Sequence, residues 1–519
     1  MISSQKNTNP TLKIILISFF FLYSLLVITK PVHIDEANFL MLTKGNFWNP
    51  HNILINWQGR TQTAFDVLSN PPGIAWFLYP VKNISIIGMR LWMMTWSVLA
   101  LWSFWELGKT TSQTRFFLYF VITSPVFALS HGSFLPDMPL LACTTAGYAF
   151  FFSKKRYIIG AFLIGLGFLF RYSAIVPMFS ILLWLIFPNK EEKEQHIIPI
   201  LFALGLAPLF LLVHDIVMYD RFHFWHMLTF QRIEKTSLQN ILQLLAVFAQ
   251  GASGVFVAFI WFSFEENRKY VCVCIMIVSG FLLESLWSGI WIALGISTLT
   301  FVPKTTISRW AGVSLALGIV FLFLPRFTAT RYWIPLLPLL ALYLQSLFAQ
   351  YRMINISFIG CGFLSFMLCL DDWEFSNGYH HIAKKIQEQN ITGSRSLAGH
   401  WGLQWYLQLQ GFITVEDDRP IEEDWLVLSS SAWPQKPSKG IYQLKKIWKN
   451  ENIYIGPTVY SISDHSHFHA NMIAPDIHTY AAWGLRNQDF DQISLWTKCM
   501  KNCEGCVWNM ESIMPTCEP

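Results

Sequence analysis

The sequence predicts a polytopic α-helical membrane protein with a C-terminal α+β domain outside the cytoplasm. Of the 519 residues, 53% are hydrophobic and 13% are charged, whereas a soluble domain carries about 25% charged residues. Apolar runs long enough to cross a bilayer recur through the first 370 residues, and the sequence then becomes mixed and polar. We therefore expect a membrane domain at residues 1–370 and a C-terminal extracytoplasmic domain at residues 371–519.

The first apolar run, residues 14–29, follows a polar N-terminus and Lys13. A secretory signal peptide begins in the same way, but it ends in a small-residue cleavage site. No such site follows residue 29, and further apolar runs do. We therefore expect a retained signal-anchor helix.

About thirteen membrane spans are predicted in total. The stretch 157–187 counts as two spans, because both of its ends are basic and the chain must cross twice, turning at Arg171. The predicted spans are residues 14–29, 86–107, 116–131, 138–152, 157–170, 173–187, 197–213, 241–262, 270–287, 290–302, 310–324, 332–348 and 354–370.

The charges of the connecting loops support this count. With the N-terminus inside, the loops assigned to the cytoplasm are rich in Lys and Arg, as the positive-inside rule requires. An odd number of spans then places the C-terminal domain outside. The net charge of +5 is small, and its distribution indicates membrane orientation instead of nucleic-acid binding. The inner basic residues are Lys109, Arg115, Lys154, Lys155, Arg156, Lys190, Lys193, Arg268, Lys269, Lys304, Arg309 and Arg352.

The C-terminal domain combines helical and strand patterns. Residues 380–390 predict an amphipathic helix, residues 425–429 a strand, and residues 453–462 one or two strands. An external location favours disulfides over a metal knuckle or free thiols for the four tail cysteines. They are Cys499, Cys503, Cys506 and Cys517. Four histidines could supply metal ligands from a strand, although their polar neighbours favour a solvated loop. They are His465, His467, His469 and His478.

The first external loop, residues 30–85, begins with two adjacent carboxylates, Asp35 and Glu36. At the outer membrane surface a carboxylate can act as a general base, or it can hold a divalent cation against a phosphate. A solvated acidic pair that caps an interfacial helix is the alternative. Further along, Pro71-Pro72 precedes an aromatic-rich segment, residues 74–80, for which we predict an interfacial helix.

Other ionisable residues lie unexpectedly on the outer side. Asp137 stands at the start of a span, where an acidic group is costly without a partner or a task; a helix N-cap is the alternative. Arginines can bind phosphate through paired, charged hydrogen bonds, and snorkelling to lipid headgroups is their alternative role. The outer arginines are Arg60, Arg171, Arg221, Arg326 and Arg331.

In their order and spacing, these motifs resemble the GT-C superfamily of membrane glycosyltransferases. The likeness is to the bacterial relatives of protein O-mannosyltransferases and lipid A aminoarabinose transferases. It covers the membrane region and extends into the C-terminal domain. The segments that carry it are Asp35-Glu36, Pro71-Pro72, Pro136-Asp137-Met138-Pro139-Leu140, Gly165–Tyr172, Arg331–Pro335 and Ala398–Tyr406.

The resemblance implies roles for individual residues. Asp35 corresponds to the proposed catalytic aspartate, and Glu36 and Asp137 to accompanying acidic positions for a metal ion or the acceptor. A divalent metal ion would lie at Asp35 and Asp137. The candidate ligands of the donor phosphate are Arg60, Arg171 and Arg331. The chain departs from the family pattern at Asn70 and Arg171, where lysine is common, so the charges around the donor phosphate differ.

The implied reaction transfers a sugar from a polyprenyl-phosphate donor to a glycan, lipid or protein acceptor, with inversion, at the outer face of a bacterial inner membrane. The C-terminal domain would then be periplasmic. No nucleotide-binding glycine loop occurs, so no nucleotide cofactor is expected. Two other classes stay open. A transporter or flippase would use a carboxylate inside a span, such as Glu284, and a non-catalytic binding protein would need no acidic residues at the outer surface.

Overall fold

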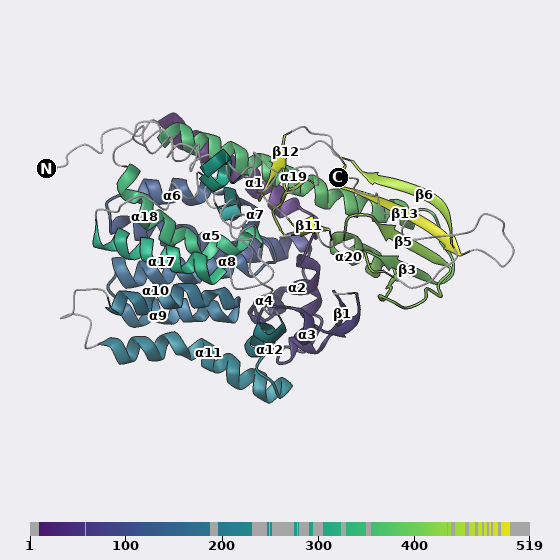
Figure 1. Cartoon of the computed structure of the whole chain (residues 1–519), viewed down its shortest axis with the longest axis horizontal. Helices are drawn as coiled ribbons and strands as arrows, with labels where there is room; N and C mark the ends of the chain where they lie inside the picture. The colour runs from purple at the N-terminus through teal and green to yellow at the C-terminus, as the bar shows by residue number, and fades with distance from the viewer. Residues whose placement is uncertain are drawn as a thin grey trace.

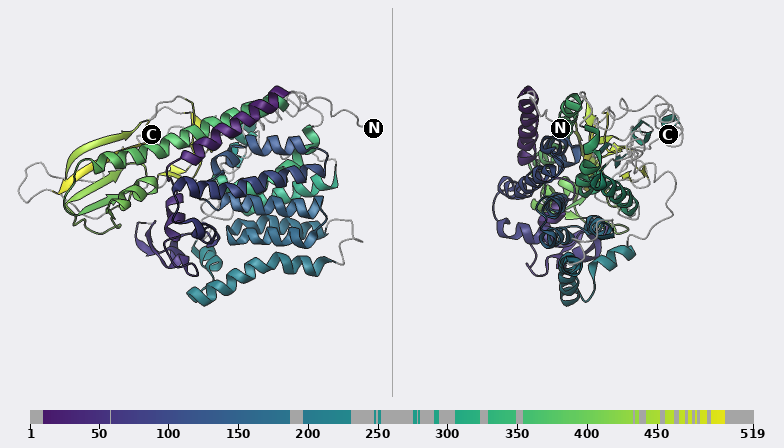
Figure 2. Two further views of the ribbon diagram at one scale, coloured as in Figure 1. Left: turned by 180° about the vertical axis from the view of Figure 1, so that it is seen from behind. Right: turned by 90° about the vertical axis from the view of Figure 1, so that its left-hand side faces the viewer.

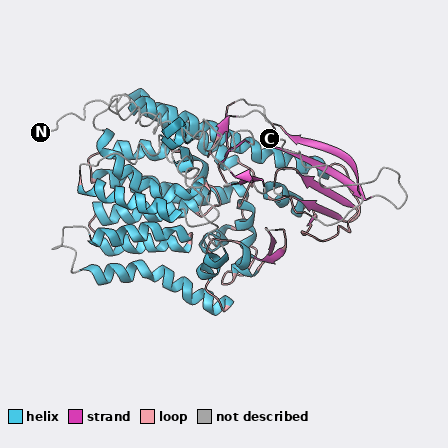
Figure 3. Cartoon of the chain, in the orientation of Figure 1, coloured by secondary structure: helices cyan, strands magenta, loops and turns pink. Residues whose placement is uncertain are grey.

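The computed structural model describes most of the chain, and its helices and strands occupy different ends of the molecule (Figures 1 and 3). Long helices lie side by side in the body, and the larger strands form a sheet beyond one end of them. The described residues are 10–498 except 58, 187–195, 231–246, 249, 252–274, 278, 280–289, 294–304, 323–328, 349–353, 433, 437–441, 452–455, 462–465, 470–471, 475–476, 479–480 and 486–488.

The helical body confirms the predicted fold class. Four of the described helices are long and apolar enough to cross a membrane, namely α1, α5, α11 and α19. The number of thirteen spans stays a prediction, because the segments 241–262, 270–287 and 290–302 lie mostly outside the described residues. The principal helices are α1 (Pro10–Thr29), α5 (Ile86–Lys109), α6 (Thr114–Thr123), α8 (Asp137–Tyr148), α9 (Tyr157–Leu166), α10 (Ile175–Ile186), α11 (Ile197–Tyr219), α17 (Thr306–Leu322), α18 (Leu337–Phe348) and α19 (Ile354–Gln387).

Two predicted boundaries can be compared directly with the helices. The chain turns at Arg171 between α9 and α10, as predicted. The predicted span 116–131 is broken, because Ser124 is extended and Pro125 starts a second helix, α7 (Pro125–Ser130). Proline has no backbone N–H to continue a helix and disfavours helical geometry in the residue before it.

Helix α19 is longer than expected. It runs from Ile354 to Gln387 without a break, so the helix predicted at residues 380–390 is the end of the last membrane helix and not a separate element. The helix therefore crosses the predicted domain boundary after residue 370. Helix α1 packs lengthwise against α19, which is seen most clearly from behind (Figure 2). The first and last described membrane helices thus lie side by side.

The ends of the helices agree with the predicted sidedness of two loops. Glu106 at the end of α5 pairs with Lys109 at 2.6 Å and with Lys154 at 2.8 Å. Both lysines come from loops assigned to the inner side. The structure brings these loops together at one end of the body, and it gathers the outer acidic and arginine residues at the other.

Short elements form the first external loop around the outer end of the helices. They include the predicted interfacial helix after the paired prolines, α4. The elements are α2 (Glu36–Leu42), η1 (Pro50–Asn52), β1 (Leu54–Asn56), β2 (Thr61–Thr63), α3 (Ala64–Val67), α4 (Gly73–Leu78) and η2 (Tyr79–Val81), and α12 (His223–Phe230) lies beside them.

The C-terminal part contains a five-stranded sheet in the order β4-β3-β5-β13-β6, accompanied by helix α20 (Trp401–Leu409). Strands β4, β3 and β5 are parallel, and β13 runs antiparallel between β5 and β6. The strand predicted at residues 425–429 is β5. The strands of this sheet are β3 (Arg395–Ala398), β4 (Ile413–Thr414), β5 (Trp425–Ser429), β6 (Tyr442–Asn450) and β13 (Asp491–Lys498).

In the described part of the C-terminal domain, six very short strands pair outside this sheet. Strand β7 pairs with β12, β8 with β9, and β10 with β11. Strands β7 and β8 confirm the strand prediction where residues 453–462 are described. The bounds are β7 (Pro457–Thr458), β8 (Tyr460–Ser461), β9 (Ser466–His467), β10 (Met472–Ala474), β11 (Ile477–His478) and β12 (Gly484–Leu485). The four tail cysteines lie outside the described residues.

Candidate functional site

Four charged side chains predicted from the sequence meet at the end of the helices that the sequence assigns to the outer side. Asp35 precedes α2, Asp137 is the first residue of α8, Arg171 lies between α9 and α10, and Arg331 belongs to the 3-10 helix η7 (Thr330–Leu336). Arg331 Nη2 donates a hydrogen bond to Asp35 Oδ2, and Arg171 Nη1 donates one to Asp137 Oδ1. Arg331 Nε is 3.7 Å from Asp137 Oδ2, so Arg331 links both carboxylates.

The capping alternatives for the two aspartates do not hold. Asp35 occupies the N-cap position of α2, but its side chain makes no capping hydrogen bond. At α8 the N-cap is Pro136, and Asp137 lies one position inside the helix. Both carboxylates turn to arginines instead. This arrangement satisfies the expectation that an acidic group at the start of a span has a partner.

The four groups differ in access to solvent. The side chains of Asp137, Arg331 and Arg171 are 0%, 4% and 6% exposed, whereas that of Asp35 is 22% exposed. The Arg171 guanidinium also stacks on the ring of Tyr332, 3.6 Å from its centroid. Asp35 is therefore the carboxylate that an incoming molecule can reach, whereas Arg171 and Arg331 are buried.

Arg331 does not use all of its hydrogen-bond donors. Its Nε and Nη1 atoms are buried and have no hydrogen-bond partner among the described residues, and the same is true of Asp137 Oδ2. Leaving a buried charged group unsatisfied is costly, so native proteins rarely do so without a reason. The free donors of Arg331 suit an anionic ligand, because guanidinium groups bind phosphate and carboxylate oxygens through several N–H groups.

Glu36 lies beside Asp35 in sequence, but its carboxylate points to a different arginine. Arg90, within α5, donates to Glu36 Oε1 at 2.8 Å and to Oε2 at 2.9 Å. Glu36 also accepts hydrogen bonds from the backbone N–H groups of His33 at 3.1 Å and Phe134 at 3.2 Å. Burial alone would raise the pKa of the Glu36 carboxyl, but the charges of Arg90 and Lys30 and these hydrogen bonds lower it to about 2.

Arg90 ties two external loops together. Besides Glu36, it donates to the carbonyl oxygens of Lys30 at 3.0 Å and Pro31 at 3.2 Å in the first loop, and to that of Gly132 at 3.4 Å in the second. The first of these loops carries Asp35, and the second leads to Asp137. The Arg90–Glu36 pair therefore sets how the backbones of the two site aspartates lie relative to each other.

The backbone just before Asp35 is strained. Ile34 has a φ of 49°, in the left-handed region that β-branched residues rarely adopt. Such a conformation costs about 1–3 kcal/mol and persists only where surrounding contacts enforce it. The hydrogen bond from the His33 N–H to Glu36 spans this turn. It helps to hold Asp35 in the position that faces Arg331.

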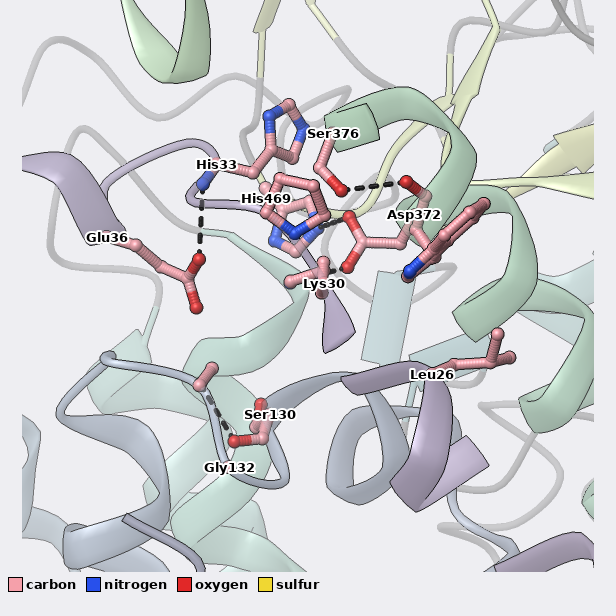
Figure 4. A network of polar contacts seen from close by, with 12 residues as sticks. Leu26, Lys30, His33, Glu36, Ser130, Gly132, Asp372, Ser376 and His469 are labelled. Carbon is pink, nitrogen blue, oxygen red and sulfur yellow. Dashed lines mark hydrogen bonds and ion pairs between the residues drawn. The ribbon is translucent and has the colours of Figure 1, made fainter. Parts of the chain in front are cut away.

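A second buried network links the first loop to the C-terminal domain (Figure 4). Lys30 Nζ lies 2.8 Å from Asp372 Oδ2, and His469 Nε2 lies 3.0 Å from Asp372 Oδ1. Lys30 follows α1, Asp372 belongs to α19, and His469 comes from the C-terminal domain. The three side chains turn toward one another in the figure. This network fixes the start of the Asp35 loop to the last membrane helix.

The prediction of a solvated histidine loop is wrong for two of the histidines. His467 and His469 are only 1% and 4% exposed. Burial, followed by the nearby charges of His469, His33 and Arg331, lowers the pKa of the His467 ring well below its ordinary value. The segment around residue 467 therefore packs against the site, whereas its polar sequence had suggested a position in solvent. His465 lies outside the described residues.

Close approaches explain two of the glycine motifs. A side chain at Gly73 would overlap the carbonyl of Leu169, which brings the paired-proline segment against the chain just before Arg171. In the C-terminal domain, a Cβ at Gly402 would lie 2.7 Å from the Val32 carbonyl oxygen. The Val32 N–H donates to the Tyr406 hydroxyl at 2.8 Å. The segment Ala398–Tyr406 thus docks on the first external loop.

The remaining predicted arginines lie elsewhere. Arg60 is 66% exposed and lies 3.6 Å from Asp418, so it is not part of the cluster that contains Arg331. Arg221 is 53% exposed and pairs with Asp66 at 3.1 Å. Arg326 lies outside the described residues. The sequence alone could not distinguish these arginines from Arg171 and Arg331, because tertiary packing decides which guanidinium groups are buried.

Arg90 and Asp372 were not among the residues singled out from the sequence, although both are central to the buried networks. Arg90 could have been recognised as an arginine inside the second predicted span, where it is the fifth residue. Asp372 stands just past the predicted end of the last span and carried no comparable signal. As for a metal site, no group of three or more metal-ligating side chains occurs in the described part of the chain.

Two crystal structures of ArnT from Cupriavidus metallidurans are similar to this chain. The apo state is 11% identical, and the match covers 77% of this chain and 84% of that chain with a TM-score of 0.41. The state bound to undecaprenyl phosphate is 12% identical, and the match covers 81% of this chain and 92% of that chain with a TM-score of 0.44. Among curated proteins, none matches the sequence. Residues 69–214 match the family described as dolichyl-phosphate-mannose-protein mannosyltransferase, which confirms the resemblance to GT-C glycosyltransferases that the motifs indicated.

Proposed function

We propose that this chain transfers a sugar from a polyprenyl-phosphate donor to an acceptor hydroxyl or amine at the outer face of the membrane. The observation that carries the proposal is Arg331, a buried guanidinium that links Asp35 and Asp137 and keeps two donor groups without a hydrogen-bond partner among the described residues. A phosphate is well matched to such donors. The name of the matched family includes a lipid-linked sugar, dolichyl-phosphate-mannose, which supports a donor of this class.

In the proposed reaction Asp35 is the general base. Its carboxylate takes the proton from the acceptor as the acceptor oxygen or nitrogen bonds to the anomeric carbon of the sugar. The bond between that carbon and the phosphate oxygen breaks, and its electron pair stays on the leaving polyprenyl phosphate. Arg331 and Arg171 stabilise the charge on this phosphate. A single displacement of this kind inverts the anomeric carbon.

The contact between Arg331 and Asp35 gives donor binding a further effect. While the two are paired, the Asp35 carboxylate is held against Arg331 and is not free to contact the acceptor. A donor phosphate that binds Arg331 competes with Asp35 for the guanidinium. Donor binding then frees the Asp35 carboxylate to contact the acceptor, so the proton is taken only in the complete complex.

A divalent metal ion is an addition to this scheme that the carboxylates allow. Asp35 and Asp137 would hold it, and the ion would supply positive charge to the donor phosphate. It would have to displace Arg331, which already links these carboxylates. We therefore expect the arginines to supply the charge, and transfer to continue after dialysis against EDTA. Loss of transfer that Mg²⁺ or Mn²⁺ restores would assign the carboxylates to a metal site instead.

We further propose that the site faces the periplasm of a bacterial inner membrane and that the acceptor is a glycan, lipid or protein. Purified protein in lipid vesicles, supplied with radiolabelled polyprenyl-phosphate sugars, tests the central claim. Transfer of label out of the lipid fraction supports it. Movement of the labelled lipid across the bilayer without transfer would support a flippase. The carboxylate considered for that alternative, Glu284, lies outside the described residues, and the family match does not favour it.

A further inference from the structure

We propose that a cavity between the first external loop and the C-terminal domain binds an uncharged sugar unit of the acceptor. The cavity has a volume of about 190 Å³ and lies between α2, the β1–β2 hairpin, α20 and β4. This inference rests on the proposed glycosyl transfer and narrows its acceptor to a carbohydrate. The polar side chains that line the cavity are Asn38, Asn56, Thr61, Gln404, Gln408 and Thr414.

The cavity lies next to the proposed base. Asn38 is three residues after Asp35, a spacing that places the two side by side on a helix surface, and its N–H donates to the Asp35 carbonyl at 3.0 Å. The base therefore lies at the N-cap of α2, and the first turn of this helix forms a wall of the cavity.

The lining is polar but carries no charge. Its amides and hydroxyls can both donate and accept, as the hydroxyl groups of a sugar require, and aliphatic residues complete the walls. Charged residues close to the lining in sequence are already paired: Glu36 with Arg90 at 2.8 Å, Glu416 with Arg419 at 2.6 Å, and Arg60 with Asp418 at 3.6 Å. A phosphate or an ammonium group would find no opposite charge in the lining itself.

One lining group has no partner. Asn38 is 5% exposed, and its Nδ2 is a buried donor without a hydrogen-bond partner among the described residues. The other amides are partly used, since Gln404 Nε2 donates to the Asn56 carbonyl at 3.1 Å and Gln408 Nε2 to Thr414 Oγ1 at 3.0 Å. A ligand hydroxyl that accepts from Asn38 would satisfy the remaining buried donor.

The strand edges at the cavity do not suit an extended peptide. Strands β1 and β4 are only three and two residues long, too short for a peptide to add as a further strand. Side chains already occupy part of these edges, because the carbonyl of Asn56 accepts from Gln404 and that of Val415 accepts from Asn56 Nδ2 at 2.9 Å. A ligand in the cavity would therefore bind mainly through side chains and not through strand pairing. Such binding favours a compact ligand such as a sugar ring.

Saturation-transfer NMR on the full-length protein in detergent tests the assignment with neutral methyl hexosides as probes. Wild-type protein should bind at least one of them. Asn38→Leu and Gln408→Leu should weaken that binding by up to about tenfold each, as the loss of one hydrogen bond predicts. Gln62→Leu is the matched control, because Gln62 is exposed on the same hairpin and does not line the cavity. Gln408 is half-buried, so its variant should fold even if Asn38→Leu does not.

Several results would overturn the cavity assignment: hexoside binding that neither variant weakens, binding of phosphorylated hexoses or serine peptides in place of neutral hexosides, or no binding at all. Binding of labelled polyprenyl phosphate is measured in parallel and should be unchanged in both variants. Normal transfer to a carbohydrate acceptor by these variants would also reject the cavity and leave the proposed reaction intact. Failure of every lipid-linked donor, with hexoside binding retained, would reject the reaction and leave the cavity intact.

Discussion

Two buried arginines, Arg90 and Arg331, hold the neighbouring carboxylates Glu36 and Asp35 in different ways. Arg90 has both oxygens of Glu36 and three backbone carbonyls as partners. Arg331 forms ion pairs with Asp35 and Asp137, and its Nε and Nη1 atoms have no hydrogen-bond partner among the described residues. A fully satisfied buried pair fixes a structure, whereas a partly satisfied one leaves donors for a ligand.

Adjacent residues in a sequence can therefore have opposite roles. Asp35 and Glu36 begin the same short helix, but successive positions of a helix point in different directions. Asp35 is partly exposed and faces the arginines of the proposed donor site, while Glu36 is buried against α5. Substitutions that separate activity from stability can test this division.

The largest expected effect is on turnover. Asp35→Asn keeps the size of the side chain but removes the basic oxygen, and a general base contributes about 10²–10⁴-fold to rate. We expect transfer in vesicles to fall by that factor, while the thermal unfolding midpoint in detergent stays close to that of the wild type. Full transfer activity in Asp35→Asn would remove the assignment of the base.

The next effect is on stability. Arg90→Met leaves the Glu36 charge buried without its partner, and breaking a buried pair costs about 3–5 kcal/mol. The thermal midpoint and the yield of folded protein should both fall. Adding Glu36→Gln should recover part of the loss, because the uncompensated charge is gone.

Arg221→Met is the matched control for this variant. Arg221 pairs with Asp66 at the surface, with the side chains 53% and 32% exposed, and exposed pairs contribute about 0–1 kcal/mol. Its midpoint should change little. If Arg90→Met proved as stable as Arg221→Met, the assignment of a stabilising role to the Arg90–Glu36 pair would be wrong.

Donor affinity should show a smaller, graded effect. Arg331→Lys keeps the charge but loses the forked donors, and a hydrogen bond to a charged group contributes about 1.5–3 kcal/mol. Binding of labelled polyprenyl phosphate should weaken by about tenfold to a hundredfold. Arg171→Lys should weaken it less, since the family that the chain resembles often has lysine at this position. Equal losses in both variants would mean that the two arginines contact the phosphate alike.

The smallest effect concerns pH. The folded-state pKa of Glu36, about 2, is below the ordinary value of about 4.3. Glu36 therefore contributes stability above the ordinary pKa, and this contribution is lost as pH falls through the folded value. Between pH 7 and pH 4 the loss should be less than about 1 kcal/mol and should steepen below pH 4. Glu36→Gln should lack this component in unfolding measurements across the same range.

Much of the architecture was predictable, because membrane helices are selected by local properties. Hydropathy and loop charges identified the helical body, the turn at Arg171 and the gathering of Asp35, Asp137, Arg171 and Arg331 at one end. The break at Pro125 has a local cause and could have been predicted as well. The continuity of α19 could not, since its polar half, after residue 370, is stabilised by packing against the C-terminal domain.

The sequence by itself predicted which charged residues gather at one end of the helical body, because the positions of membrane helices follow from the length, hydropathy and flanking charges of each segment. Only the tertiary structure decided which arginine takes which carboxylate, which outer arginines are buried and where the histidines of the C-terminal domain lie. Arg331 and Asp35 are 296 residues apart in the chain, and no local pattern connects them. Their contact depends on how helices from distant parts of the sequence pack, and packing decides which buried charges are fully paired and which retain donors for a ligand.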